Sequence, residues 1–175
     1  RVTMMTSLVL TVIGPDKPGL VEMLAQTISE NNGNWLESGM SRLAGKFAGI
    51  LITQVPESHC DTLISALGKL ETQGLKVIAE RSENSTTATA SESFTLELVG
   101  HDKPGIVRDI SSALAKRGVN VERLNTELVS GSMSAELLFK ATAELIAPED
   151  LDLDTIQEDL EAIASDLMVD ITLNT

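Results

Sequence analysis

Hydrophobic and polar residues along the chain follow two periods, one typical of strands and one typical of helices. In the segment Phe94–Leu98 every second residue is apolar, which predicts a strand with one buried face. Apolar residues recur at every fourth position from Leu20 to Ile28 and again from Ile106 to Leu114, which predicts an amphipathic helix in each half of the chain. Pro18 and Pro104 suit the first turns of these helices, where no amide hydrogen is needed.

Three further elements follow the first helix. Asn34–Leu43 and Phe47–Val55 have the pattern of two strands joined by a short turn through Gly45, which predicts a hairpin. His59–Gln73 has the spacing of a second amphipathic helix, and Leu75–Ala79 has the pattern of a short last strand. The order βαββαβ predicts an α+β, ferredoxin-like fold, in which two helices cover one face of a four-stranded antiparallel sheet.

The whole pattern occurs twice. The segment Gly14–Val21 reads Gly-Pro-Asp-Lys-Pro-Gly-Leu-Val, and Gly100–Val107 reads Gly-His-Asp-Lys-Pro-Gly-Ile-Val. The same offset places further residues of the first copy on residues of the second: Asn34 on Asn120, Gly45 on Gly131 and Leu51 on Leu137. The second copy is slightly longer, and we expect its extra residues in a loop around Ala143–Asp154. The chain is therefore predicted to be a tandem repeat of two domains.

A polar segment without periodicity separates the two copies. Residues 82–93 are rich in Ser, Thr, Glu and Asn, which is the composition of a flexible linker. We therefore expect a first domain over residues 4–81, a linker over residues 82–93 and a second domain over residues 94–175.

Composition and charge exclude several classes of function. The net charge of -13 and the pI near 4.4 disfavour direct binding of nucleic acid, because that affinity comes largely from Lys and Arg. A single cysteine, Cys60, forms no intramolecular disulfide and no multi-cysteine zinc site, which favours a reducing cytoplasm. No apolar run approaches the roughly 18 residues needed to span a bilayer. We expect a cytoplasmic protein that contacts neither nucleic acid nor membrane directly.

Side chains that could catalyse a reaction are few and scattered. His59 and Cys60 are neighbours at a predicted helix start, but neither recurs in the second copy, so an incidental role is favoured over a nucleophile and base. His101 replaces Pro15 of the first copy and is favoured as an exposed loop residue. The acidic segment Glu149–Asp154 lacks the glycine and ligand spacing of a calcium loop and is interpreted as a helix-capping run. We expect no enzyme activity, no metal and no cofactor.

The repeated turn is the best candidate for a binding site. Glycine allows the backbone to approach a ligand closely, and a helix N-terminus presents unpaired amide hydrogens that suit a carboxylate. An alternative is that the motif is only a good turn with an Asp cap. Asn34 and Asn120, each opening the strand after a helix, could hold an ammonium or carboxylate group. The predicted ligand-binding residues are Gly14, Asp16, Lys17, Pro18, Gly19, Leu20 and Asn34 in the first copy, and Gly100, His101, Asp102, Lys103, Pro104, Gly105, Ile106 and Asn120 in the second.

The turn Gly14–Val21 after a strand, with a helix ending near Gly33-Asn34, resembles an ACT domain. Two such domains in tandem, with the hairpin segment Ser41–Gly49 in the first, resemble the family of bacterial transcriptional repressors of the glycine cleavage system. The resemblance implies that a small amino acid, glycine or serine, binds near the turns and that the chain forms a homo-oligomer. It also implies repression through contact with a transcriptional activator, with glycine opposing repression. A second reading is an amino-acid sensor that acts in trans as an allosteric subunit of a metabolic enzyme.

Overall fold

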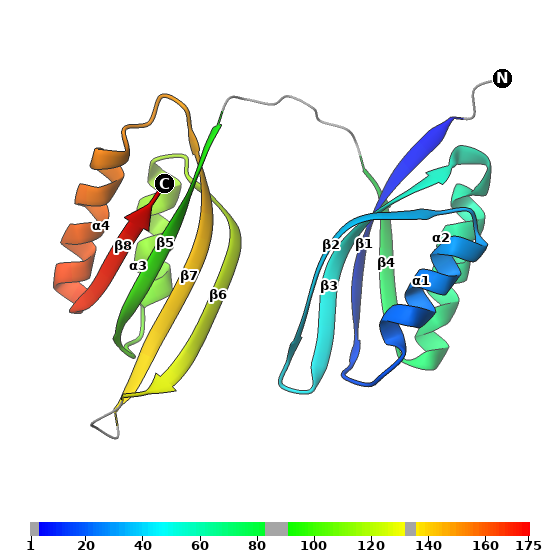
Figure 1. Ribbon diagram of the computed structural model, residues 1–175, viewed down its shortest axis with the longest axis horizontal. Coiled ribbons are helices and arrows are strands. Elements are labelled where there is room, and N and C mark those ends of the chain that lie inside the picture. Colours follow the sequence, from blue (N-terminus) through cyan, green and yellow to red (C-terminus); the bar gives the residue numbers. More distant parts are fainter. Residues whose placement is uncertain (1–3, 83–90, 132–135) are drawn as a thin grey trace. The chain divides into compact units, whose positions relative to one another are not determined.

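The computed structural model describes residues 4–82, 91–131 and 136–175, and the chain divides into two compact units between residues 85 and 86 (Figure 1). Most of the predicted linker, residues 83–90, lies outside the described residues. The last residues assigned to the linker belong instead to the second unit, because Glu92 and Ser93 pair with Ala147 and Ile146 in a sheet. None of the helices within the described residues is long and apolar enough to span a bilayer.

The first unit has the predicted order of elements. These are β1 (Met5–Pro15), α1 (Leu20–Glu30), β2 (Asn34–Leu43), β3 (Lys46–Pro56), the 3-10 turn η1 (Glu57–His59), α2 (Cys60–Gly68), the 3-10 turn η2 (Lys69–Gln73) and β4 (Lys76–Arg81). The strands form one antiparallel sheet in the order β2-β3-β1-β4, with β1 paired to both β3 and β4.

The second unit repeats this order. Its elements are β5 (Ser91–His101), α3 (Ile106–Lys116), β6 (Asn120–Ser130), β7 (Leu137–Pro148), α4 (Leu153–Leu167) and β8 (Val169–Asn174). The sheet order β6-β7-β5-β8 matches that of the first unit, and all its pairs are antiparallel. The predicted α+β fold, two tandem ferredoxin-like modules, is confirmed.

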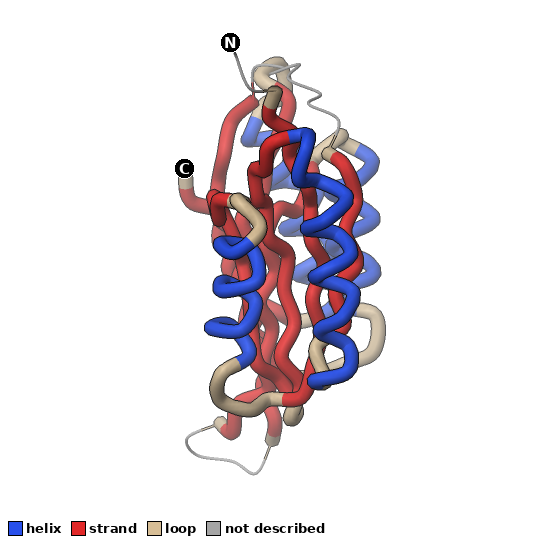
Figure 2. The backbone as a smooth tube through the Cα atoms, turned by 90° about the vertical axis from the view of Figure 1, so that its right-hand side faces the viewer, coloured by secondary structure: helices blue, strands red, loops and turns tan. Residues whose placement is uncertain are grey.

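One face of each sheet and the helices above it form a single core. In β1, Leu8, Leu10 and Val12 are buried while the residues between them are more exposed, as the period-2 pattern predicts. They pack with Leu24 and Leu63 of the two helices in the core of the first unit. Figure 1 shows both helices of each unit on the same side of its sheet, and in Figure 2 the two helices nearest the viewer lie in front of the strands. Within the part of the chain that the structure describes, each unit is thus a two-layer sandwich whose other sheet face carries no helix of the same unit.

The second helix of the first unit differs from the prediction, whereas that of the second unit is continuous. The single helix expected over His59–Gln73 is an α-helix only over Cys60–Gly68 and continues as the 3-10 turn η2. Gly68 lies at this change, and glycine is a weak helix former. In the second unit α4 is continuous, and Asp152 caps it by accepting a hydrogen bond from the backbone N–H of Asp154 at 3.1 Å. The capping role predicted for the acidic run is confirmed at Asp152.

The extra residues of the second copy lie mainly in its β6–β7 hairpin, not around Ala143–Asp154 as predicted. Phe47 pairs with Gly14 in the first sheet, and Phe139 pairs with Gly100 in the second. Phe139 is therefore the counterpart of Phe47, and the predicted match of Leu51 with Leu137 is wrong. The predicted match of Gly45 with Gly131 is wrong for the same reason, since the carbonyls of Gly45 and Leu137 accept equivalent hydrogen bonds from the two turns. Residues 132–135 of this hairpin lie outside the described residues.

This corrected register shows that the second core is less completely filled than the first. Leu51 pairs with Leu10, whereas the counterpart of Leu51 is Ala143, which pairs with Leu96. Leu51 is fully buried. In the second unit, the smaller Ala143 lines an apolar cavity of about 40 Å³ under α3, together with Ile110. A void of this kind forgoes the contacts that a larger side chain makes.

Substituting Leu51 tests this account of the core. We expect Leu51→Ala to lower the free energy of unfolding of the first unit by about 2–5 kcal/mol, because it removes buried methyl groups and leaves a cavity. Urea denaturation followed by circular dichroism measures the change. Val21→Ala, at a half-exposed position on α1, is the control and should change stability by under about 0.5 kcal/mol. Equal effects of the two substitutions would contradict the packing described here.

Candidate functional site

The turn between β1 and α1 is fixed by a close backbone approach. Gly14 is buried, and a Cβ atom at this position would lie 2.9 Å from the backbone oxygen of Gly74. Gly100 has the same role in the second unit, where a Cβ would lie 2.9 Å from the Cα of Val169. Only glycine allows β1 and β5 to pass so close to the strand that follows the second helix. The first glycine of each motif is therefore required by packing.

The lysine of each motif holds the end of the second helix. Lys17 Nζ donates a hydrogen bond to the backbone oxygen of Gln73 at 3.2 Å, and Lys103 Nζ donates one to that of Leu167 at 3.0 Å. These carbonyls are the last of η2 and α4, where no further helical N–H follows. A cation there also suits the negative end of the helix dipole. The sequence motif gave no sign of these partners, because they lie far along the chain.

The aspartate of the motif is not a helix cap, in contrast to the alternative drawn from the sequence. The N-cap of α1 is Gly19, with φ of 92°, and no side chain caps the helix. The backbone N–H of Asp16 instead donates to the carbonyl of Gly45 at 3.0 Å. Its carboxylate lies 3.5 Å from the guanidinium of Arg42, a residue that the sequence did not single out. Asp16 thus ties the turn to the tip of the β2–β3 hairpin.

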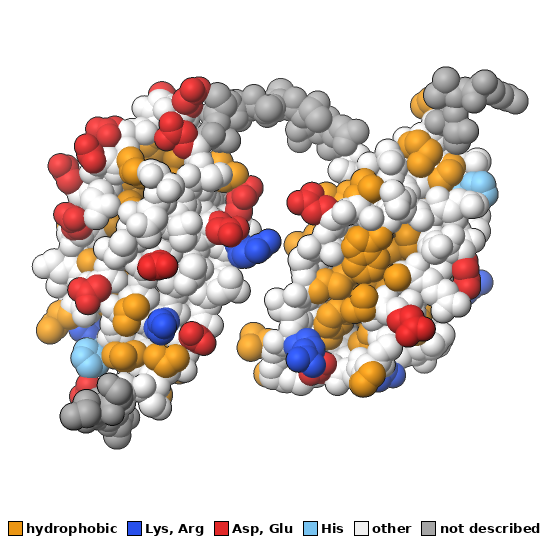
Figure 3. Space-filling model, viewed as in Figure 1, with side chains coloured by type: hydrophobic (Ala, Val, Ile, Leu, Met, Phe, Trp, Pro, Cys, Tyr) orange, Lys and Arg blue, Asp and Glu red, His pale blue; other side chains and the backbone are white. Residues whose placement is uncertain are grey.

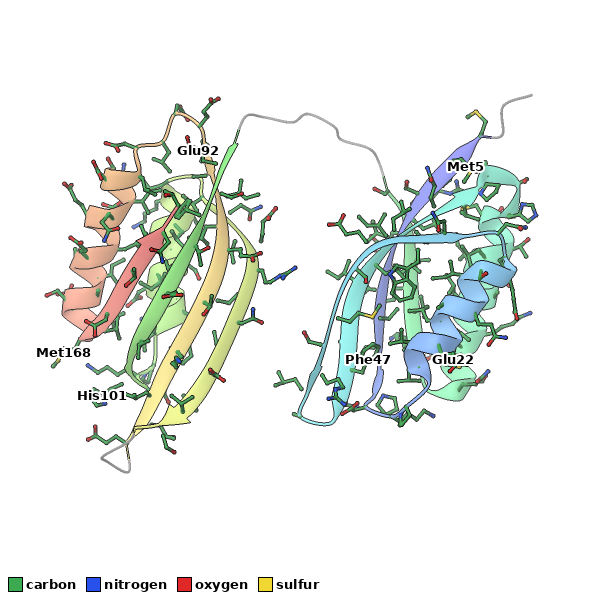
Figure 4. The ribbon with its side chains drawn as sticks, viewed as in Figure 1. Met5, Glu22, Phe47, Glu92, His101 and Met168 are labelled. Carbon is green, nitrogen blue, oxygen red and sulfur yellow. The ribbon has the colours of Figure 1, made fainter. Side chains whose placement is uncertain are left out.

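A shallow, open hollow of about 600 Å³ lies beside the first turn. Its lining residues are Lys17, Pro18, Gly19, Leu20, Glu22, Met23, Gln26 and Gln73. The uncapped N-terminus of α1 opens here, so its first amide hydrogens and the positive end of the helix dipole face this region. Glu22 stands on α1 (Figure 4), and with Lys17 it places one negative and one positive group on the wall of the same hollow.

The second turn has different chemistry around the same backbone. His101 is the last residue of β5, and Glu92 lies near the other end of the same strand (Figure 4). The Nδ1 of His101 lies 3.1 Å from Oε2 of Glu136. A hollow on the hairpin side of this turn is lined by His101, Asp102, Glu136 and Leu137. Arg108 occupies the helix position corresponding to Glu22, and its guanidinium lies 3.1 Å from the Asp109 carboxylate. The two turns are therefore chemically unequal.

The two asparagines lie away from the turns within their own units. Asn34 pairs with Gln54, which pairs with Ser7 near the start of β1, whereas the turn follows the end of that strand. Ser7 and Gly14 are seven positions apart along the strand, which is about 23 Å. Asn120 is placed in the same way by its pairing with Ile146. Each unit brings the other predicted residues together at one end of its sheet and leaves the asparagine at the other.

The residues weighed as catalytic candidates do not converge. Cys60 is buried at the start of α2, and burial raises the pKa of its thiol, which disfavours the thiolate. His59 Nδ1 lies 3.1 Å from the Ser58 hydroxyl on the surface. Within residues 4–82, 91–131 and 136–175, no three His, Cys, Asp or Glu side chains gather as a metal-binding group.

Comparison with known proteins identifies both units. Models of the ACT domain match residues 6–79 and residues 94–139, which together make up more than half of the chain. The UPF0237 protein MJ1558 of Methanocaldococcus jannaschii is 30% identical over 82 residues, which cover 45% of this chain and 91% of that protein. The chain belongs to the ACT-domain proteins. Its two units are ACT domains in tandem.

Two solved structures are similar to nearly the whole chain. A crystal structure described as an unknown protein from Galdieria sulphuraria is 25% identical, has a TM-score of 0.83 and covers 98% of each chain. A crystal structure of a candidate glycine cleavage system transcriptional repressor is 20% identical, with a TM-score of 0.71 and coverage of 98% of each chain. At this identity the second likeness establishes the fold alone. The fold and the ACT family support an amino-acid-sensing, regulatory role.

The hydrogen bonds of the two motif lysines can be tested by stability. We expect Lys17→Met and Lys103→Met each to lower the free energy of unfolding by about 1 kcal/mol, since each leaves a helix-end carbonyl without its donor. The loss should be larger at Lys103, whose hydrogen bond is partly buried. Thermal unfolding measures both, with Lys69→Met on the surface of η2 as the matched control. Unchanged stability in both variants would contradict the assigned role.

Proposed function

We propose that this tandem ACT protein is a non-enzymatic regulator that binds a small amino acid beside the β1–α1 turn of its first unit. We further propose that the amino acid is glycine, and that the protein represses transcription of glycine cleavage genes by contacting a transcriptional activator. The choice of glycine and of this target rests on the resemblance to the bacterial repressor family. The choice of the first turn rests on its chemistry.

The observation that carries the proposal is the pairing of opposite charges in one hollow. An α-amino acid at neutral pH has a carboxylate and an ammonium group bonded to the same carbon atom. The N-terminus of α1 and the Lys17 ammonium suit the carboxylate, and Lys17 keeps two further N–H donors beside its bond to Gln73. The Glu22 carboxylate suits the ammonium group. At the second turn Arg108 replaces Glu22, so the carboxylate that suits the ammonium group is missing from that helix position, and the first turn is the stronger candidate.

The proposal that the target is a protein follows from the charge of the chain. The net charge is -13, and Figure 3 shows Asp and Glu side chains spread over the second unit. Such a surface repels the phosphates of DNA. A repressor with this charge would act on transcription through an activator that itself holds DNA. Ligand binding would change the affinity for that activator only by favouring one state of the protein over another.

A second candidate function keeps the amino-acid site but changes the partner. The protein would then be an allosteric subunit that transmits the amino-acid concentration to a metabolic enzyme. The two functions share the hollow at the first turn and differ in the partner, so partner identity separates them.

Ligand binding is tested by isothermal titration calorimetry of the full chain with glycine and serine. We expect saturable binding that Glu22→Gln weakens about 10-fold to 100-fold, because it removes the charged partner of the ligand ammonium. Arg108→Gln, at the corresponding helix position of the second unit, is the matched control and should leave the affinity unchanged. Asn34→Ala tests whether the predicted asparagine contributes.

The outcomes of this titration are distinct. Absence of heat with every common amino acid would refute binding. A loss of affinity in Arg108→Gln but not in Glu22→Gln would place the ligand at the second turn.

The partner is tested by electrophoretic mobility shift on a glycine cleavage promoter. At physiological salt the chain alone should leave the DNA unshifted, because its charge opposes the contact. Added to DNA that already carries the activator, it should change the mobility of that complex, and glycine should reverse the change. A sequence-specific shift by the chain alone would overturn the protein-contact mechanism. A change in the rate of a metabolic enzyme, with no effect on the activator complex, would favour the allosteric-subunit function.

A further inference from the structure

Within the described residues of the first unit, the face of the sheet that carries no helix is unusually apolar. This outer face, opposite α1 and α2, presents residues of all four strands in three rows that run across the sheet. The rows are Glu37, Ile52, Val9 and Glu80; then Gly39, Ile50, Thr11 and Ile78; then Ser41, Ala48, Ile13 and Lys76. Ile50 is 58% exposed, Ile78 48% and Ile13 46%, on three adjacent strands. Contiguous exposed isoleucines of this kind mark an interface.

The second unit provides an internal comparison on the same scaffold. Its corresponding rows are Arg123, Glu144, Thr95 and Asn174; then Asn125, Thr142, Glu97 and Thr172; then Glu127, Lys140, Val99 and Asp170. Only Val99 is apolar, and Arg123 lies 3.8 Å from Glu144 in an ion pair on this face. The fold itself therefore does not require an apolar outer face. Of the two units, only the first has apolar residues across this face.

The charged residues of the first outer face lie in its first and third rows. Glu37 and Glu80 are the two end residues of the first row, and Lys76 is an end residue of the third row. Glu80 and Lys76 lie on the same strand, four residues or about 13 Å apart, so they are too far apart to form an ion pair within the chain. A two-fold axis parallel to the sheet and perpendicular to its strands places β4 over β4 with its direction reversed. Lys76 of each copy then meets Glu80 of the other.

We propose that the outer face of the first unit packs face to face against the same face of a second copy of this chain, with the strands antiparallel. The isoleucine rows form the dry centre of this isologous interface, and two reciprocal Lys76–Glu80 pairs lie at its rim. Sheets that pack in this way keep their strand directions within about 30° of each other, which the antiparallel arrangement satisfies. The interface is independent of the amino-acid hollow.

The size of the face predicts a weak dimer. Four strands about 4.8 Å apart, paired over about eight residues, make a face on the order of 500 Å² per copy. Stable interfaces typically bury about 800 Å² per partner. We therefore expect a reversible equilibrium with a dissociation constant on the order of micromolar.

Sedimentation equilibrium of the full chain over a range of concentrations tests the proposal. The wild type should move from monomer to dimer, and Ile50→Glu should weaken the dimer about 100-fold, because it buries a charge in an apolar contact. Thr142→Glu, at the corresponding position of the second unit, is the matched control and should dimerise like the wild type. Circular dichroism verifies that both variants fold. A wild type that stays monomeric, or a dimer that survives Ile50→Glu, would overturn the proposal.

Charge reversal tests the orientation. Lys76→Glu and Glu80→Lys should each weaken the dimer about 10-fold, since each turns both rim pairs into repulsive ones, and the double variant should restore wild-type affinity. In a parallel arrangement the two-fold axis runs along the strands and places β4 of one copy over β2 of the other, so Lys76 does not meet Glu80 and neither single change would weaken association. That result would overturn the antiparallel interface.

Discussion

Each unit of this protein depends on one close contact between its first turn and the end of its second helix. Gly14 passes against the backbone of Gly74, and Lys17 binds the carbonyl of Gln73 just before it. Gly100 and Lys103 make the same contact with Val169 and Leu167. The contact fixes where the central strand ends and where the first helix begins. Because no side chain caps that helix, its N-terminal amides are left facing the adjoining hollow.

The two copies have kept this backbone contact and diverged around it. The first turn has Lys17 and Glu22 in one hollow and an Asp16–Arg42 ion pair at its edge. The second has His101 beside Glu136, and Leu128 stands where the first unit has Arg42. The divergence extends to the outer sheet faces, which are apolar in the first unit and polar in the second. The first unit thus holds both the proposed ligand site and the proposed dimer surface.

Several site features followed from local sequence, and several did not. The turn, its glycines and the helix after it were predictable because a motif of adjacent residues determines them. The partners of Lys17 and Asp16 were not, because Gln73 and Arg42 reach the turn only when the second helix and the hairpin fold back onto it. Asn34 was grouped with the turn because it follows the first helix, yet that helix carries the chain to the opposite end of the sheet. The short separation of Asn34 from the turn in the sequence did not indicate how far apart they lie along the sheet.

The sequence by itself determined the order of elements, the buried face of each strand and the tandem repeat, because hydrophobic periodicity is a local property of the chain. It could not determine the strand register of the second hairpin. An insertion of an even number of residues leaves the alternation of buried and exposed positions unchanged, so Leu137 and Ala143 fit the pattern equally well as counterparts of Leu51. Only the pairing of β5 with β7 separated the two. The tertiary structure likewise decided which charges share a hollow and which apolar residues share a face, because both depend on strands and helices distant in sequence lying side by side.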